Sequence, residues 1–338
     1  MVLPVTPPVK PMLAKLTTEI PVGPGWVYEP KWDGFRAIVF RDKDYVHIQS
    51  RDNKPLERYF PELVPAFQES LPDKCVIDGE VILVGPDGLD FGSLQQRIHP
   101  AVSRITLLSE TTPAGFVAFD ALAFGRRDLR KKPLSERREV LLDFLPGESG
   151  TPKPGRGTQI STTPQSDSAD EARVWLETLE AIGLDGIIAK KVDEPYVEGK
   201  RTMVKVKQRR TVDCVVGAYR LSKTGDGIGS LLLGLYDDGG TLHFVGHTSS
   251  FKAAERREIL EMLHPLEGEG SFGHGRTPGE QSRWSTGKEG EWVGLRPELV
   301  AEVTHDKMQG DRFRHAATFV RWRDDKKPEE CKMDQVLV

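Results

Sequence analysis

The segment Lys31-Trp32-Asp33-Gly34-Phe35-Arg36 carries the clearest chemical potential in the chain. A lysine placed three residues before a glycine and five before an arginine, between two apolar stretches, can hold a nucleophilic amine against a phosphate. A lysine amine attacks only when it is deprotonated, and desolvation or neighbouring cations favour that state. Arg36, Lys205 and Lys207 could supply the cations. The pattern predicts the reactive centre of an enzyme that attaches a nucleotide to itself; the alternative is a solvated strand-turn-strand with surface charges.

Six further short blocks follow in order along the chain. They are Ser50-Arg51, Val76-Ile77-Asp78-Gly79-Glu80, Phe116-Val117-Ala118-Phe119-Asp120, Leu184-Asp185-Gly186-Ile187-Ile188-Ala189-Lys190, Lys205-Val206-Lys207 and Arg323-Asp324-Asp325-Lys326. Together with the first segment they resemble the motifs of the covalent nucleotidyltransferases, which comprise ATP-dependent DNA ligases, RNA ligases and mRNA capping enzymes. The resemblance spans nearly the whole chain. It is closest to the small bacterial ligases of the mycobacterial ligase C group and to the ligase module of ligase D.

The resemblance implies catalytic roles for five residues. Lys31 would attack the α-phosphorus of ATP and hold AMP as a phosphoramide. Lys205 and Lys207 alternate with valines along a predicted strand, so both ammonium groups would point to one side and neutralise phosphate; an exposed edge strand is the alternative. Arg323 and Lys326 would act on the leaving pyrophosphate if the second domain closes over the first, a familiar way to assemble a site. A solvated basic tail is the alternative for that block.

The same resemblance implies a set of nucleotide contacts: Glu29, Arg36, Arg51, Glu80, Phe119 and Lys190. Phe119 would stack on adenine, and Glu29 would accept a hydrogen bond from the adenine amino group and so discriminate adenine from guanine. Arg51 would contact ribose or phosphate. The alternatives are a core position for Phe119 and an ordinary exposed acid for Glu29.

Glu80 and Asp185 are the predicted metal ligands. Mg²⁺ (or Mn²⁺) takes carboxylate oxygens together with phosphate and water. Related sequences usually carry glutamate where this chain has Asp185, and the shorter side chain favours a water-bridged contact. Glu80 could contact the ribose instead.

Length, composition and cysteine content limit the class of protein. At 338 residues two domains are expected. There is no apolar run long enough for a membrane span and no signal-peptide pattern at the amino terminus. The three widely spaced cysteines predict reduced thiols in a cytoplasmic protein. The net charge of −4 means that a DNA-binding surface must be a segregated basic face. Its candidates are Arg209, Arg210, Arg220, Lys223, Arg312, Arg314 and Arg321.

The element pattern predicts an α+β fold: an adenylation domain of antiparallel sheets and helices over residues 1–208, then an OB-fold barrel over residues 209–338. A hairpin is expected around Asp42-Lys43-Asp44, and helices at Pro133 to Leu145 and after a capping box at Ser168 to Glu171. The barrel strands are predicted at 212–219, 231–236, 242–246, 299–304 and 319–322, with a helix over 252–263. A linker is expected from Pro146 to Gln159 and a mobile loop from Gly268 to Gly279.

The first functional interpretation is an ATP-dependent DNA ligase that seals 5′-phosphate, 3′-hydroxyl nicks through an enzyme-AMP and a DNA-adenylate, in DNA repair. Its expected partners are nicked or broken double-stranded DNA and a Ku-like end-binding protein, and the chain is expected to be a monomer without membrane contact. Two alternatives stay open. One is an RNA ligase or other polynucleotide nucleotidyltransferase, and the other is a non-catalytic module that binds nucleic-acid ends.

Overall fold

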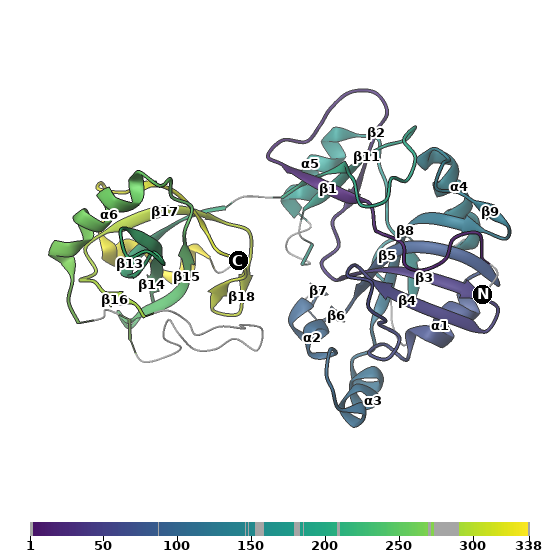
Figure 1. The fold of residues 1–338 in the computed structure, drawn as a ribbon, viewed down its shortest axis with the longest axis horizontal. Helices are drawn as coiled ribbons and strands as arrows, with labels where there is room; N and C mark the ends of the chain where they lie inside the picture. Colours follow the sequence, from purple (N-terminus) through teal and green to yellow (C-terminus); the bar gives the residue numbers. More distant parts are fainter. Residues whose placement is uncertain are drawn as a thin grey trace. The chain divides into compact units, whose positions relative to one another are not determined.

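The computed structural model of the chain describes residues 3–86, 88–145, 147, 149–152, 159–178, 183–184, 186–207, 210–269, 272–273 and 291–336. The chain divides into two compact units, Met1–Gln208 and Arg209–Val338 (Figure 1). Several predicted features lie outside the described residues: Asp185, Arg209, and most of the predicted linker and mobile loop. So do Leu179 and Ile182, which are expected on the apolar face of the helix after the capping box.

Two sheets form the first unit. One has the strand order β1 (Leu13–Thr17), β12 (Arg201–Val206), β11 (Ile187–Lys191), β2 (Trp26–Pro30). The other has the order β10 (Ile160–Thr162), β8 (Gly115–Phe124), β5 (Lys74–Ile82), β3 (Phe35–Asp42), β4 (Tyr45–Ser50), with β9 (Arg127–Asp128) paired to β8. A short ribbon joins β6 (Val84–Gly85) and β7 (Gly88–Leu89). The helices are α1 (Leu63–Ser70), α2 (Phe91–Gln96), α3 (Val102–Thr111), α4 (Leu134–Phe144) and α5 (Ala169–Thr178).

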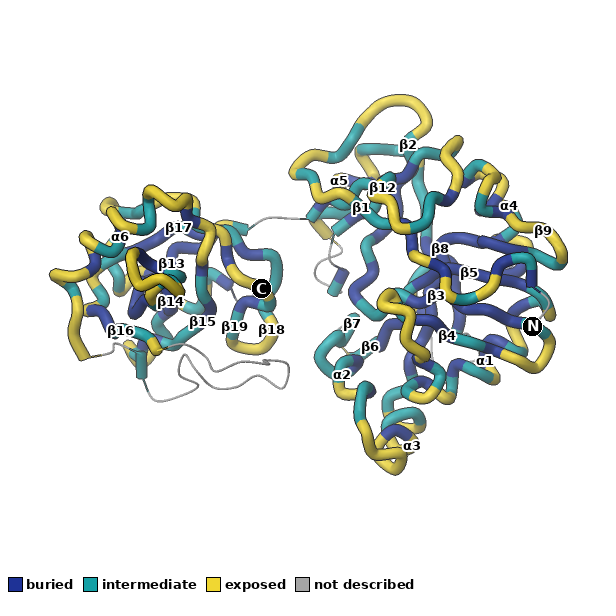
Figure 2. The backbone as a smooth tube through the Cα atoms, viewed as in Figure 1, coloured by how far each residue is buried: buried dark blue, intermediate teal, exposed yellow. Residues whose placement is uncertain are grey.

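The predicted hairpin is confirmed as β3 and β4, which turn at Lys43 and Asp44. The predicted α+β fold is confirmed, but its sheets are mixed and not antiparallel throughout, because β1 pairs with β12 and β10 pairs with β8 in parallel. Neither pair is joined by a tight turn, so no hairpin dictates its direction. The core of the second sheet lies between its strands and α1, with Phe60, Phe67 and Ile77 fully buried (Figure 2).

Two helices differ in detail from the prediction. The leucine spacing predicts that Leu142 shares one face of α4 with Leu134, Leu141 and Leu145. In the structure, however, Leu142 is exposed, whereas Arg137 is buried. The Arg137 guanidinium pairs with the buried Asp120 carboxylate of β8 at 2.7 Å, and a buried charge requires such a partner. At the start of α5 only half of the capping box forms: Ser168 Oγ accepts from Glu171 N at 3.2 Å. The Glu171 carboxylate accepts from Ser166 Oγ instead.

The second unit is an OB-type barrel. Its sheet has the order β15 (Leu242–Thr248), β14 (Ile228–Tyr236), β13 (Arg210–Leu221), β17 (Val300–His305), β20 (Thr318–Trp322), with β16 (Val293–Gly294) on β13. The ends of this sheet meet, because Ala317 N donates to His247 O at 2.9 Å and Phe319 N donates to Ser250 Oγ at 2.8 Å. The five predicted strands are confirmed, and the predicted helix is α6 (Glu255–Leu263).

The remaining short elements of this unit are β18 (Met308–Gln309), β19 (Arg312–Phe313) and the 3-10 turns η2 (His264–Leu266), η3 (Pro328–Glu330) and η4 (Met333–Gln335). Cys75, Cys214 and Cys331 are all buried and form no disulfide. None of the helices in the described ranges has the length and apolar composition needed to cross a bilayer.

Candidate nucleotide-binding site

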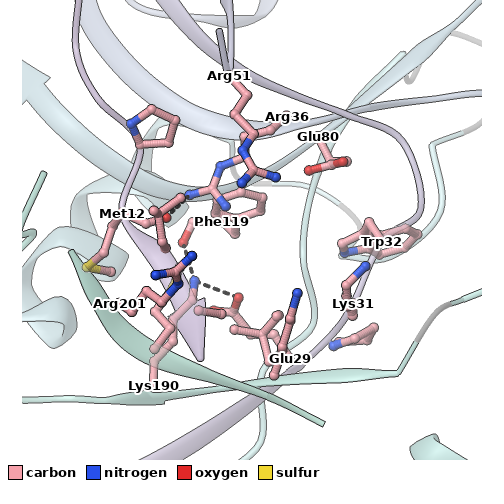
Figure 3. A pocket seen from close by; sticks show the side chains of 17 residues that line it. Met12, Glu29, Lys31, Trp32, Arg36, Arg51, Glu80, Phe119, Lys190 and Arg201 are labelled. Carbon is pink, nitrogen blue, oxygen red and sulfur yellow. Dashed lines mark hydrogen bonds and ion pairs between the residues drawn. The ribbon is translucent and has the colours of Figure 1, made fainter. Parts of the chain in front are cut away.

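Both sheets of the first unit contribute side chains to a pocket of about 240 Å³ (Figure 3). The predicted site residues that line it are Glu29, Lys31, Arg36, Arg51, Glu80, Phe119, Lys190 and Lys205. They come from β2, β3, β5, β8, β11 and β12 and from the loops that follow β2 and β4. Residues scattered over some 180 positions of sequence therefore meet around one cavity.

The loop that carries Lys31 is held closely by its surroundings. Lys31 N donates to Gly186 O at 2.8 Å, and the buried indole of Trp32 donates to Thr163 Oγ1 at 2.9 Å. A Cβ at Gly34 would lie 2.1 Å from Val81 O, so only glycine allows the loop to approach β5 this closely. These contacts fix the backbone of the loop at the pocket, where Figure 3 shows the Lys31 side chain close to Trp32.

Glu29 and Lys190 form a buried ion pair at the pocket. Lys190 Nζ lies 2.7 Å from Glu29 Oε2, and the two side chains are 4% and 3% exposed. The same Nζ lies 3.5 Å from Phe119 O and 4.8 Å from the centroid of the Phe119 ring. The alternative of an ordinary exposed acid at Glu29 is therefore wrong. Carboxylate, ammonium and aromatic ring together offer an acceptor, a donor and a stacking surface to a purine base.

Arg36 has partners that the sequence did not predict. Its Nε and Nη2 donate to the two carboxylate oxygens of Asp78, each at 2.6 Å. Asp78 is fully buried and also accepts from the Tyr196 hydroxyl at 2.6 Å. The Arg36 guanidinium lies 4.4 Å from the centroid of the Phe119 ring, a cation–π distance. Burial opposes ionisation of Arg36, but the Asp78 carboxylate raises its pKa above the ordinary value. Arg36 is therefore a fixed cation that braces Phe119 and whose strongest bonds go to Asp78.

Glu80 is a carboxylate in an unusual environment. Burial raises its pKa from 4.5 to about 7, although Arg36 and Lys31 act to lower it. Asp33 and Asp78 add to the increase by charge repulsion. The ionised form of this carboxyl group is disfavoured, and a nearby cation would stabilise it. A divalent metal whose other ligands are phosphate and water could be that cation. The described residues hold no ready-made cluster of three or more metal-ligating side chains, and Asp185 lies outside them.

Strand β12 places every second side chain at the pocket. The pocket is lined by Arg201, Met203 and Lys205, which are two residues apart along the strand. This agrees with the prediction that Lys205 and the neighbouring valines point to opposite sides. Lys207 lies beyond the end of β12 and is not among the described residues that line the cavity. Arg201 was missed at the sequence level, although the same two-residue alternation, extended back from Lys205, would have identified it.

Arg323 and Lys326 belong to the second unit, where both bind one carboxylate. Asp213 of β13 accepts two hydrogen bonds of 2.9 Å from Arg323 Nη1, and its Oδ2 lies 2.9 Å from Lys326 Nζ. The Asp213 side chain is only 12% exposed. Arg323 Nε and Nη2 donate to the two carboxylate oxygens of Asp325 at 2.8 and 2.9 Å. The block is thus an ordered, charge-neutralised cluster and not a solvated basic tail. Of the predicted basic face, Arg321 is paired with Glu302 at 2.6 Å and Lys223 is exposed.

Comparison with known proteins identifies the family to which the chain belongs. The family described as "ATP dependent DNA ligase domain" matches residues 11–207, and the "ATP dependent DNA ligase C terminal region" matches residues 224–326. The chain is 49% identical to DNA ligase C1 of Mycolicibacterium smegmatis and 49% identical to DNA ligase C of Mycobacterium tuberculosis. In both cases 99% of this chain and 96% of the relative are covered.

Among solved structures, a Lig E DNA ligase superposes with a TM-score of 0.57 over 93% of this chain and 99% of that one. At 18% identity that likeness shows the fold alone. The domain matches, the near full-length relatives and the pocket around Lys31 agree, and the chain belongs to the family of ATP-dependent DNA ligases.

Proposed function

We propose that the chain seals DNA nicks that carry a 5′-phosphate and a 3′-hydroxyl. The Lys31 amine attacks the α-phosphorus of ATP, a P–N bond forms and pyrophosphate leaves. The 5′-phosphate of the nick then takes AMP from Lys31, and the 3′-hydroxyl attacks that phosphate and releases AMP. The observation that carries the proposal is the convergence of Lys31 with Glu29, Phe119, Lys190 and Lys205 on one pocket.

Each part of the nucleotide has a candidate partner in this pocket. Phe119 stacks on adenine, and Glu29 accepts from the 6-amino group. The Lys190 ammonium has three donors, of which one is directed to Glu29 and a second lies near Phe119 O, so the third can donate to adenine N1. Arg51 and Lys205 have the charge to bind phosphate. This arrangement presents an acceptor and a donor in the order that the adenine edge requires.

A divalent metal is part of the proposal. Glu80 and Asp185 would hold Mg²⁺ or Mn²⁺, which when bound neutralises charge on the reacting phosphate. The raised pKa of Glu80 fits a carboxylate whose partner is a cation. Arg323 and Lys326 of the second unit carry the charge suited to the leaving pyrophosphate, and so does Lys207, which belongs to the first unit.

The biological setting is a further proposal. The ligase would act in DNA repair, in the cytoplasm, as a monomer and with a Ku-like end-binding partner. The three free, buried cysteines support the cytoplasmic location. An RNA ligase is the second candidate, because the adenylation chemistry would be the same. Sealing of matched DNA and RNA nicks with ATP, GTP or NAD, measured side by side, distinguishes these substrates.

The nucleophile is tested by mass spectrometry of the intact protein after incubation with ATP and Mg²⁺. The unmodified chain should gain the mass of one AMP, and Lys31→Ala should gain none. Lys15→Ala is the matched control, because Lys15 is an exposed lysine on β1 outside the pocket. An AMP adduct on Lys31→Ala would show that another residue is the nucleophile. No adduct on the unmodified chain would favour a non-catalytic end-binding module.

A further inference from the structure

Gln165 lies outside all of the motif blocks, yet its side chain contacts the proposed adenine-binding acid. Gln165 Nε2 donates to Glu29 Oε1 at 2.9 Å. The backbone beside it is bonded to β2, since Tyr28 N donates to Ser166 O at 2.8 Å and Ser166 N donates to Tyr28 O at 3.0 Å. This bridge adjoins Glu29, so the position of Gln165 relative to that residue is fixed by the fold.

With this contact, each oxygen of the Glu29 carboxylate has a side-chain partner. Lys190 holds Oε2 at 2.7 Å and Gln165 holds Oε1. A carboxylate has about four lone-pair sites, and these two bonds leave sites available on both oxygens. The terminal torsion of a glutamate is otherwise broad. With one partner on each oxygen, the carboxylate plane cannot turn without breaking one of these two contacts.

We propose that Gln165 is a positioning residue for adenine discrimination and that it acts through Glu29. The inference rests on the proposed function of the pocket. A carboxylate with a fixed plane keeps an acceptor directed at the 6-amino group of adenine, and it opposes the O6 acceptor of guanine. Without Gln165 the carboxylate can rotate toward Lys190, which weakens the contact with adenine and relaxes the exclusion of guanine. Discrimination of this kind depends on buried polar groups that cannot re-orient.

The test compares two nucleotides on the full-length chain. Self-adenylation is measured with ATP and with purine riboside triphosphate, which lacks the 6-amino group. Gln165→Met keeps the side-chain length and removes the donor. It should lower kcat/KM for ATP on the order of tenfold, mainly through KM, as loss of one hydrogen bond to a charged group implies. The loss with purine riboside triphosphate should be much smaller, and use of GTP relative to ATP should rise.

Gln159→Met is the matched control, because the Gln159 amide donates to Ala114 O at 2.8 Å and does not line the pocket. It should change neither reaction. Equal losses with both nucleotides in Gln165→Met would overturn the inference, because a purely structural role does not depend on the 6-amino group. Gln165→Ala removes the same donor. If the methionine variant does not fold, the same comparison of the two nucleotides is made with Gln165→Ala. If the unmodified chain forms no adduct with ATP, the proposed function fails first, and this inference fails with it.

Discussion

The titration of Glu80 gives a prediction whose size follows from the pocket. Burial raises its pKa from 4.5 to about 7 in the folded protein. Because the folded pKa is higher than the unfolded one, the folded protein binds this proton more tightly, and ionisation of Glu80 opposes folding. The cost is absent below the unfolded pKa, grows as pH rises from 4.5 to about 7, and is constant above that.

The full shift corresponds to about 3 kcal/mol at ~1.4 kcal/mol per pKa unit. Between about pH 5 and pH 8.5 the change in unfolding free energy is on the order of 2 kcal/mol, and solvent in the pocket reduces it further. Glu80→Gln removes the titration. The stability of Glu80→Gln relative to the unmodified chain should therefore rise by that amount over this interval.

Urea unfolding of both proteins, without nucleotide or metal, measures the difference at several pH values. Comparing the change with pH, and not the absolute stabilities, cancels the effect of replacing the carboxyl by an amide. Glu57→Gln is a useful comparison. Burial acts to raise the pKa of Glu57, but hydrogen bonds from His47 and from the backbone bring it below its ordinary value. For that site the sign reverses: the charged form stabilises the fold, and its contribution is lost as pH falls. A Glu80→Gln difference that stays flat from pH 5 to pH 8.5 would refute the reasoning.

Two further predictions concern the proposed metal and pyrophosphate contacts. Asp185→Ala should reduce nick sealing on the order of 10²-fold if the metal contributes several kcal/mol, whereas Asp185→Glu should keep much of the activity; equal, near-normal rates for both variants would exclude a metal contact. Replacing both Arg323 and Lys326 by alanine should block self-adenylation but spare closure of a nick that already carries a 5′-adenylate, since no pyrophosphate is then present. The pair leaves Asp213 without its two cations, so the same assay is run with Asp213→Asn added. Closure that falls as far as self-adenylation in both backgrounds would assign these residues to DNA binding or folding instead.

Local sequence was sufficient for the elements that carry the chemistry. Alternation along single strands placed Lys205 on the pocket side of β12, and the run of short strands from β13 to β20 predicted the barrel. Each of these predictions depends on residues close together in the chain. The periodicity of a strand is set by its own backbone, so it can be read without knowing the neighbouring strand.

The predictions that failed or were missed depend on partners far away in sequence. Arg36 binds Asp78, and Tyr196 joins them from 118 positions further along the chain. Gln165 reaches Glu29 across 136 positions. Strand periodicity shows which face is buried but not which strand lies beside it, so the parallel pairing of β1 with β12 was also missed.

The sequence by itself therefore determined the fold type of each domain and the order of the candidate site residues along the chain, because residue type and short-range spacing are local properties. Only the tertiary structure decided how those residues are oriented. Lys190 and Gln165 hold the two oxygens of Glu29, and Asp78 holds the guanidinium of Arg36. The physical reason is that a buried charge must find a partner wherever the packing of the sheets brings one within hydrogen-bonding distance.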